Sequence, residues 1–261
     1  MEIIEQKDNK LKVVIDKINP VIANTLRRVI MTEVPVMAID TVTLVKNNSG
    51  LFDEVLAHRL GLVPLKTDLK PYNLPSECKC DGEGCALCQV NLTMDIKGPC
   101  TVYSRDLKSD DDKIVPVHED MPLTKLNEKI HSLKLEAVAT LGRGTEHAKY
   151  SPGLVFYHGY PDIKISDKLE NGEEIAKVRS ELYEFKNGKL KIKDITKCDL
   201  SNAGDDIAKP KGAIEVSASN EKFIFNLESW GQLSHKEIFR EAFKIIDSNL
   251  DDFSKEVKKI K

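Results

Sequence analysis

The sequence predicts a mixed α+β fold in which the two ends of the chain form one domain and the middle is inserted into it. Helical patterns are strongest near the two ends, over about residues 21–33 and after residue 234. Between them, apolar residues mostly alternate with polar ones, as they do in half-buried strands. Helices confined to the ends of a β-rich stretch favour an α+β protein over alternating βαβ units.

The first helix has clear start and stop signals. A short strand over Leu11–Ile15 precedes Asn19 and Pro20, which suit the N-cap and the first helical position. We expect the helix to run from about residue 21 to 33, because Pro35 cannot continue its hydrogen bonds. Four apolar residues at helical spacing are expected to face a core: Ile22, Leu26, Val29 and Ile30.

The middle of the chain has strand patterns and one further helix. Residues 39–45 are rich in β-branched side chains and predict a strand. Residues 51–60 predict a helix, with Gly61 as its C-cap. Alternation predicts more strands over residues 90–96, 133–139, 154–157, 213–216 and 223–227. Residues 166–209 are rich in charge and predict a small excursion domain or an ordered insertion.

The C-terminal helix carries the most regular pattern. Ser234 and Glu237 fit a capping box. Apolar residues then recur every 3.5 positions on average, which predicts a helix about 40 Å long packed along another helix. The pattern fits a seam with a partner chain and equally a helix on the protein's own sheet. The seam comprises Phe239, Phe243, Ile246, Leu250, Phe253, Val257 and Ile260.

Composition and charge restrict the class of protein. The 261 residues are 41% hydrophobic and 31% charged, with a net charge of −3. This is an ordinary globular composition, whereas a protein that binds nucleic acid by its phosphates usually has a basic excess. No apolar run reaches the roughly 20 residues of a membrane span, and the charged N-terminus does not resemble a signal peptide. We therefore expect a cytoplasmic protein without membrane association or direct specific DNA binding.

Four of the six cysteines form a metal-like constellation. Cys78, Cys80, Cys85 and Cys88 lie on a Gly-rich loop, and four thiolates can close around zinc. An Fe–S cluster uses the same ligands, so the residues alone leave both metals open. Either would be structural, since four protein ligands leave no open position. The isolated Cys100 and Cys198 are expected to be packing residues.

Signals for catalysis are weak. The Gly-x-Gly of the polar loop at residues 142–144 lacks the third glycine of a dinucleotide fingerprint, because His147 stands there. The six histidines are scattered, and we expect no catalytic residue in this chain. On the first helix, Asn24, Arg27 and Arg28 should project from the side opposite the core. They suit charge-assisted hydrogen bonds, or are simply solvated.

Four segments in order resemble the α-type subunits of RNA polymerases. Residues 24–28 (NTLRR) are similar to the family's N-x-L-R-R signature, and residues 58–65 (HRLGLVPL) to its second signature. The loop ending in KYSP at residues 149–152 is similar to the third, and residues 225–231 (FNLESWG) resemble the stretch before the last helix. The similarity is greatest to the archaeal D-type subunits, the equivalents of the third-largest subunit of eukaryotic polymerase II.

The resemblance implies a domain organisation. The dimerisation domain would comprise residues 1–40 and 213–261, with an inserted β-rich domain at 41–160 that contains the cysteine loop 78–88. Residues 161–212 stand where several archaeal relatives carry a ferredoxin-like domain. Only Cys198 occurs there, too few ligands for a cluster. We therefore expect a degenerate insertion, and a structural zinc rather than an Fe–S cluster at the cysteine loop.

The resemblance also implies a function and partners. The chain would be a non-catalytic assembly subunit of DNA-directed RNA polymerase, a nucleotidyltransferase complex that carries out transcription. It would form a heterodimer with the small L subunit through its terminal helices. Asn24, Arg27 and Arg28 would dock the large catalytic subunits, and the small zinc-bearing subunits N and P would complete the platform.

Overall fold

A computed structural model describes residues 1–198, 200–201 and 203–260, so Asp199, Asn202 and Lys261, which the predicted domain ranges include, lie outside it. The chain divides into two compact units. One contains residues 1–27 and 155–227, and the other contains residues 28–154 and 228–261. The described elements are helices and antiparallel strands, in agreement with the predicted α+β class.

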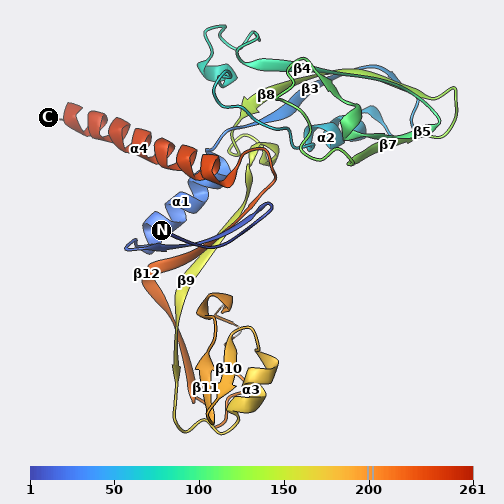
Figure 1. The fold of residues 1–261 in the computed structure, drawn as a ribbon. Helices are drawn as coiled ribbons and strands as arrows, with labels where there is room; N and C mark the ends of the chain where they lie inside the picture. Colours follow the sequence, from blue (N-terminus) through green and yellow to red (C-terminus); the bar gives the residue numbers. More distant parts are fainter. Residues whose placement is uncertain (199, 202, 261) are drawn as a thin grey trace. The chain divides into compact units, whose positions relative to one another are not determined.

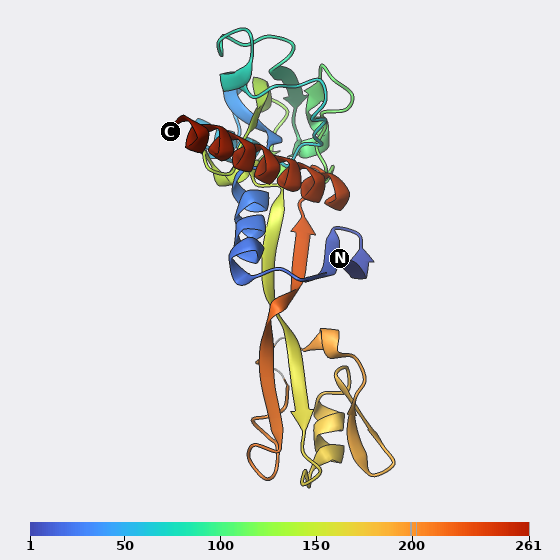
Figure 2. The same cartoon turned by 90° about the vertical axis from the view of Figure 1, so that its left-hand side faces the viewer.

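A four-stranded sheet in the order β1-β2-β12-β9 runs through the first unit. β1 (Glu2–Lys7) and β2 (Lys10–Asp16) form a hairpin. In the sheet, β2 lies beside the long strand β12 (Ile214–Ser229), and β12 lies beside the long strand β9 (Gly153–Ile165). These two run side by side in opposite directions (Figure 2). The two strands predicted at 213–216 and 223–227 are therefore one. The sequence pattern breaks because most residues between them are exposed on both faces.

The charge-rich segment folds around a small core of its own. It contains α3 (Gly172–Val178) and the hairpin of β10 (Tyr183–Lys186) and β11 (Lys189–Ile192). Tyr183 is 1% exposed and donates a hydrogen bond from its hydroxyl to the carbonyl oxygen of Ala203 at 2.7 Å. Cys198 is 1% exposed in the same core, which confirms its packing role.

The second unit is built on a sheet in the order β3-β8-β4-β6 (Figure 1). The helix α2 (Asp53–Gly61) buries Leu56 and Leu60 in the same core as the apolar face of this sheet. A two-stranded sheet, β5-β7, completes the unit. The strands are β3 (Val36–Asn47), β4 (Gln89–Lys97), β5 (Cys100–Tyr103), β6 (Lys108–Ser109), β7 (Pro122–Leu126) and β8 (Ser132–Gly142).

The two predicted terminal helices are present. α1 (Pro20–Thr32) begins where the backbone N–H of Ile22 donates to the Asn19 side chain at 2.9 Å, which confirms the N-cap. α4 (His235–Lys259) begins with the predicted capping box, in which Ser234 and Glu237 bond reciprocally. No helix in the described part of the chain has the length and apolar character of a membrane span.

Two local predictions were wrong. Ile22 is 51% exposed, because the buried face of α1 passes through Ala23, Leu26 and Ile30 instead. A small alanine at this position hid that face from the apolar pattern. Gly61 is the last helical residue of α2, and the C-cap is Leu62 at a φ of −90°. The turn after α2 therefore does not use the left-handed conformation for which glycine is favoured.

Candidate metal centre and docking surfaces

Four cysteine thiols converge between residues 78 and 88. The Sγ atoms of Cys78 and Cys85 lie 3.6 Å apart, those of Cys80 and Cys88 3.5 Å, and those of Cys85 and Cys88 3.8 Å. All four lie within 4.8 Å of one another. None is in a disulfide. Among the described residues this is the one such group of metal-binding side chains.

The loop backbone explains the convergence. Asp81, Gly82 and Gly84 have φ angles of +50°, +84° and +93°, so the chain turns back on itself twice. Gly84, at a φ of +93°, has a backbone conformation that other residues rarely adopt, which explains the glycine at this position. The backbone N–H of Cys85 donates to Sγ of Cys88 at 3.2 Å. Backbone N–H groups make the same kind of hydrogen bond to thiolates that bind metal ions.

The geometry of the thiols fits a metal ion. Thiolates about 2.3 Å from a tetrahedral zinc lie about 3.8 Å from one another, close to the observed separations. The Cys78 thiol and the Gly84 backbone N–H lower the pKa of Cys80 to about 6, so this residue readily supplies a thiolate. Burial raises the pKa of Cys88 to about 12. A cation at the centre would reverse that effect, because metal binding deprotonates a thiol. The four cysteines could therefore hold a metal ion.

The polar face of α1 is arranged by an internal contact. Arg27 donates from Nε and Nη2 to Oδ1 of Asn24, at 3.2 and 3.0 Å. Because both N–H groups donate to the same oxygen, the plane of the Arg27 guanidinium is fixed. The other N–H groups of the guanidinium point away from Asn24. Arg28, one residue on, is exposed. The predicted docking residues thus share the polar side of the helix.

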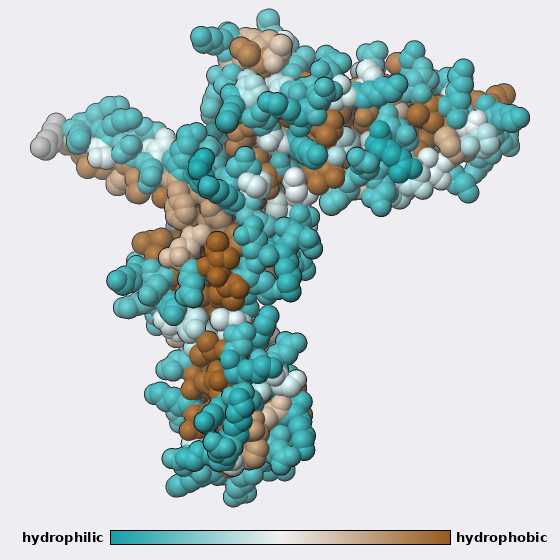
Figure 3. All heavy atoms as spheres, viewed as in Figure 1, coloured by the Kyte–Doolittle hydropathy of each residue, from teal (hydrophilic) through white to brown (hydrophobic). Residues whose placement is uncertain are grey.

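The apolar seam of α4 changes character along its length. Phe239 is 5% exposed and stacks on Phe243 with ring centroids 6.3 Å apart. Phe243 itself is 45% exposed, and Ile246 is half-buried. Beyond it, the seam residues are 47–84% exposed: Leu250, Phe253, Val257 and Ile260, of which Ile260 is the C-cap. One side of α4 is hydrophilic and the other hydrophobic (Figure 3). The helix therefore does not rest on its own sheet over this length.

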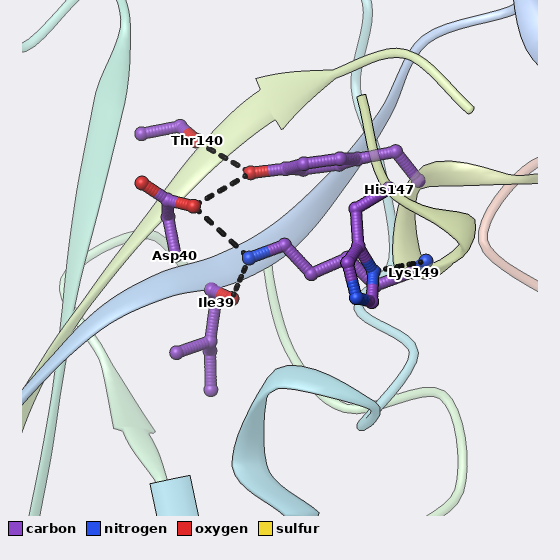
Figure 4. A network of polar contacts seen from close by, with 6 residues as sticks. Ile39, Asp40, Thr140, His147 and Lys149 are labelled. Carbon is purple, nitrogen blue, oxygen red and sulfur yellow. Dashed lines mark hydrogen bonds and ion pairs between the residues drawn. The ribbon is translucent and has the colours of Figure 1, made fainter. Parts of the chain in front are cut away.

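The loop at residues 142–152 is fastened to β3 by a polar network (Figure 4). Lys149 donates from Nζ to Oδ1 of Asp40 at 3.0 Å and to the carbonyl oxygen of Ile39 at 3.1 Å. The Tyr150 hydroxyl lies 3.1 Å from Oγ1 of Thr140 and donates to Oδ1 of Asp40 at 3.2 Å. Burial and the nearby Asp40 carboxylate raise the pKa of Tyr150 to about 12.

The two glycines of this loop are explained by close packing. A Cβ atom at Gly144 would lie 2.2 Å from the carbonyl oxygen of Met31, and one at Gly142 would lie 2.5 Å from the Tyr150 ring. The backbone N–H of Thr145 donates to the carbonyl oxygen of Thr32 at 3.1 Å. The Gly-x-Gly sequence thus lets the loop approach the end of α1, a structural role that needs no nucleotide.

Comparisons with known proteins identify the family of this chain. Residues 37–154 match the family model of the RNA polymerase Rpb3/RpoA insert domain, which defines the class of the second unit. The chain is 36% identical to the DNA-directed RNA polymerase subunit Rpo3 of Archaeoglobus fulgidus, over 100% of the chain and 98% of the relative. It is 39% identical to Rpo3 of Methanothermobacter thermautotrophicus, over 93% and 92%, and 36% identical to Rpo3 of Pyrobaculum arsenaticum, over 99% and 96%. The chain belongs to the Rpo3 family of DNA-directed RNA polymerase subunits.

The sequence found the cysteines, the polar face of α1 and the apolar seam, but missed the anchor of the 142–152 loop. Asp40 is the one acidic residue in the run from Val36 to Val45. An acidic residue directly after the buried residues Val36–Ile39 is a signal for a polar partner, because a carboxylate at the edge of a core can accept charge-assisted hydrogen bonds. Its partners, Lys149 and Tyr150, are too distant in sequence to be found by pattern.

Proposed function

We propose that this protein is a non-catalytic assembly subunit of DNA-directed RNA polymerase, which pairs with a small L-type subunit to form the platform for the large catalytic subunits. The observation that carries the proposal is the exposed apolar seam of α4. Membership in the Rpo3 family supports the same role.

The seam is a surface that needs a partner. Four large apolar side chains from Leu250 to Ile260 are 47–84% exposed on the 25-residue helix and its C-cap. Burying one such side chain fully contributes roughly 1.5–3 kcal/mol, so their exposure to water leaves a substantial driving force for association. The spacing of 3.5 residues is that of knobs packing into the holes of a second helix. A helix of the small subunit would supply that second surface.

The polar face of α1 suits the large subunits. Asn24 orients the guanidinium of Arg27, and Arg28 is exposed beside it. Arginine forks bind carboxylates and backbone carbonyls in a fixed geometry, which favours a specific protein contact over a diffuse one. The zinc-bearing subunits N and P would then complete the platform.

A zinc ion at the cysteine loop would have a structural role in this assembly. Cys78, Cys80, Cys85 and Cys88 would hold it and close a loop that otherwise has little apolar core. A bound zinc ion would cross-link the loop. It would not catalyse a reaction, because all four coordination positions would be filled by cysteine thiolates. We expect no Fe–S cluster, either here or around the lone Cys198.

We propose three domains along the chain. Residues 1–40 and 213–261 would form the dimerisation domain, and residues 41–160 the inserted domain. Residues 161–212 would be a degenerate insertion at the ferredoxin-like position, kept for its own small core around Tyr183 and Ile175.

Co-expression with an L-type subunit tests the proposal. We expect a one-to-one heterodimer by light scattering, with about one zinc per heterodimer by metal analysis. Leu250→Asp should abolish the heterodimer, because it places a charge in the middle of the seam. Ser248→Asp is the matched control, since Ser248 is an exposed residue on the opposite side of the same helix turn.

The alternatives are distinguishable. A monomer that ignores the L-type subunit would refute the assembly role. Iron with visible absorbance would refute the zinc assignment and leave the pairing untouched. Equal behaviour of Leu250→Asp and Ser248→Asp would show that α4 is not the interface.

A further inference from the structure

A cavity of 340 Å³ in the second unit lies between α2, β5 and β7. Two cations, Arg59 and Lys125, line it, and no acidic residue does. The local charge is thus opposite to the net charge of −3 of the whole chain. The remaining lining residues are Gly50, Leu51, Thr101, Pro122, Leu123, Thr124 and Asn127.

The polar groups of this cavity are largely unused within the chain. Arg59 donates from Nη2 to the carbonyl oxygen of Pro122, which takes one of its five N–H donors. Within the described chain, neither Arg59 nor Lys125 forms an ion pair with a carboxylate. Arg59 therefore keeps four N–H donors, and Lys125 its ammonium group, for an acceptor that arrives from outside the chain.

Apolar side chains beside the cavity indicate which kind of molecule supplies that acceptor. Val55 is 44% exposed and precedes Arg59 by four positions, so the two share a face of α2. Phe52, the N-cap residue of the same helix, is 80% exposed. Asp53, at the start of this helix, is held by the Asn47 side chain at 2.7 Å. Apolar residues beside a cation fit an apolar side chain next to a carboxylate, whereas a phosphate backbone would leave Phe52 in water.

We infer that this cavity is a docking site for a protein segment that carries an aspartate or glutamate beside an apolar residue. The carboxylate is bound by Arg59 and Lys125, and the apolar neighbour covers Phe52 and Val55. The inference rests on the proposed assembly role, because another subunit of the polymerase supplies the segment. It is separate from the α4 seam and from the arginines of α1.

Selective labelling of lysines tests the site in the assembled polymerase. Acetylation of Lys125 should slow by about tenfold in the polymerase relative to the isolated heterodimer with the L-type subunit, because the amine reacts only when it is unpaired. Lys129, exposed and outside the cavity, is the matched control and should react at an unchanged rate. A carbodiimide, which joins an amine to a carboxylate in direct contact, should then couple Lys125 to an aspartate or glutamate of another subunit.

Each outcome decides the inference. Equal labelling of Lys125 in polymerase and heterodimer overturns it while the assembly role stands. Protection that disappears after nuclease treatment also overturns it, since the occupant is then a phosphate. A chain that does not co-purify with polymerase overturns the assembly role and this inference together. Lys125→Gln should lower the fraction of the chain retained on polymerase in high salt, with Lys129→Gln unchanged and both variants equally folded by circular dichroism.

Discussion

The Nζ atom of Lys149 lies 3.0 Å from the Oδ1 atom of Asp40, although the two residues are 109 positions apart. The same Oδ1 atom accepts a hydrogen bond from Tyr150, and the Lys149 side chain is only 14% exposed. A carboxylate that accepts from two donors of one loop, one of them on a largely buried lysine, holds that loop more firmly than a single surface ion pair does. This contact fixes the 142–152 loop against β3.

Removing the Tyr150 hydroxyl should loosen that loop. Tyr150→Phe loses the bonds to Thr140 and Asp40, and we expect the free energy of unfolding to fall by about 1–2 kcal/mol. Urea denaturation measures it. The double-mutant cycle with Thr140→Val should show coupling between the two sites, because they share a hydrogen bond. An unchanged denaturation midpoint in Tyr150→Phe would contradict the role given to the network.

Adding a methyl group at Gly144 should be far more damaging than its size suggests. The new Cβ would lie 2.2 Å from the Met31 carbonyl oxygen, so either the loop or the end of α1 must move. We expect Gly144→Ala to lower the free energy of unfolding by roughly 1–3 kcal/mol, as overpacking does. Gly50→Ala is the control, since no atom lies within 4 Å of that position. Similar stability of the two variants would be inconsistent with the close approach.

Loss of metal from the cysteine loop should unfold the loop locally. Treatment with a chelator is expected to increase hydrogen exchange over residues 75–89 and to lower the melting temperature by roughly 5 °C or more. Cys80→Ser should reproduce both effects and lower the zinc content. Cys100→Ser is the control, because Cys100 lies outside the cluster. Exchange that does not respond to the chelator would mean that no bound metal holds the loop.

Acid should destabilise the second unit through Asp68 and Asp111. The Tyr72 hydroxyl donates to Oδ2 of Asp111 at 2.5 Å and lowers the pKa of that carboxyl. The backbone N–H of Lys70 and the Lys113 ammonium lower the pKa of Asp68. Because both pKa values are depressed in the folded state, their stabilisation is complete above the unfolded value of about 4 and is lost as the pH falls below it.

Stability measured from pH 7 to pH 2 checks this expectation. The free energy of unfolding should be nearly constant down to about pH 5 and then decrease. Asp111→Asn should be less stable at pH 7 and should show a weaker dependence on acid. An equally steep decrease in Asp111→Asn would assign the acid sensitivity to other carboxyls.

Signals from neighbouring residues predicted several helices and strands well. The Asn19 cap, the Ser234–Glu237 capping box and the alternation of residues 90–96 depend on neighbours within a few positions, and all three are confirmed. The Ile22 assignment was wrong because Ala23, a small residue, takes the buried position. The joining of two strand signals into β12 was missed because its exposed middle has no apolar alternation.

The sequence by itself determined the apolar seam of α4, the cysteine cluster and the family, because each depends on spacing along the chain. Tertiary structure alone decided which surfaces are used inside the chain and which remain exposed. It buried Phe239 and left Leu250 and Phe253 exposed on the same seam. It brought Asp40 to Lys149, and Arg59 to the cavity that Lys125 and Thr124 line. These contacts join residues tens of positions apart, and no periodic pattern encodes a distance in space.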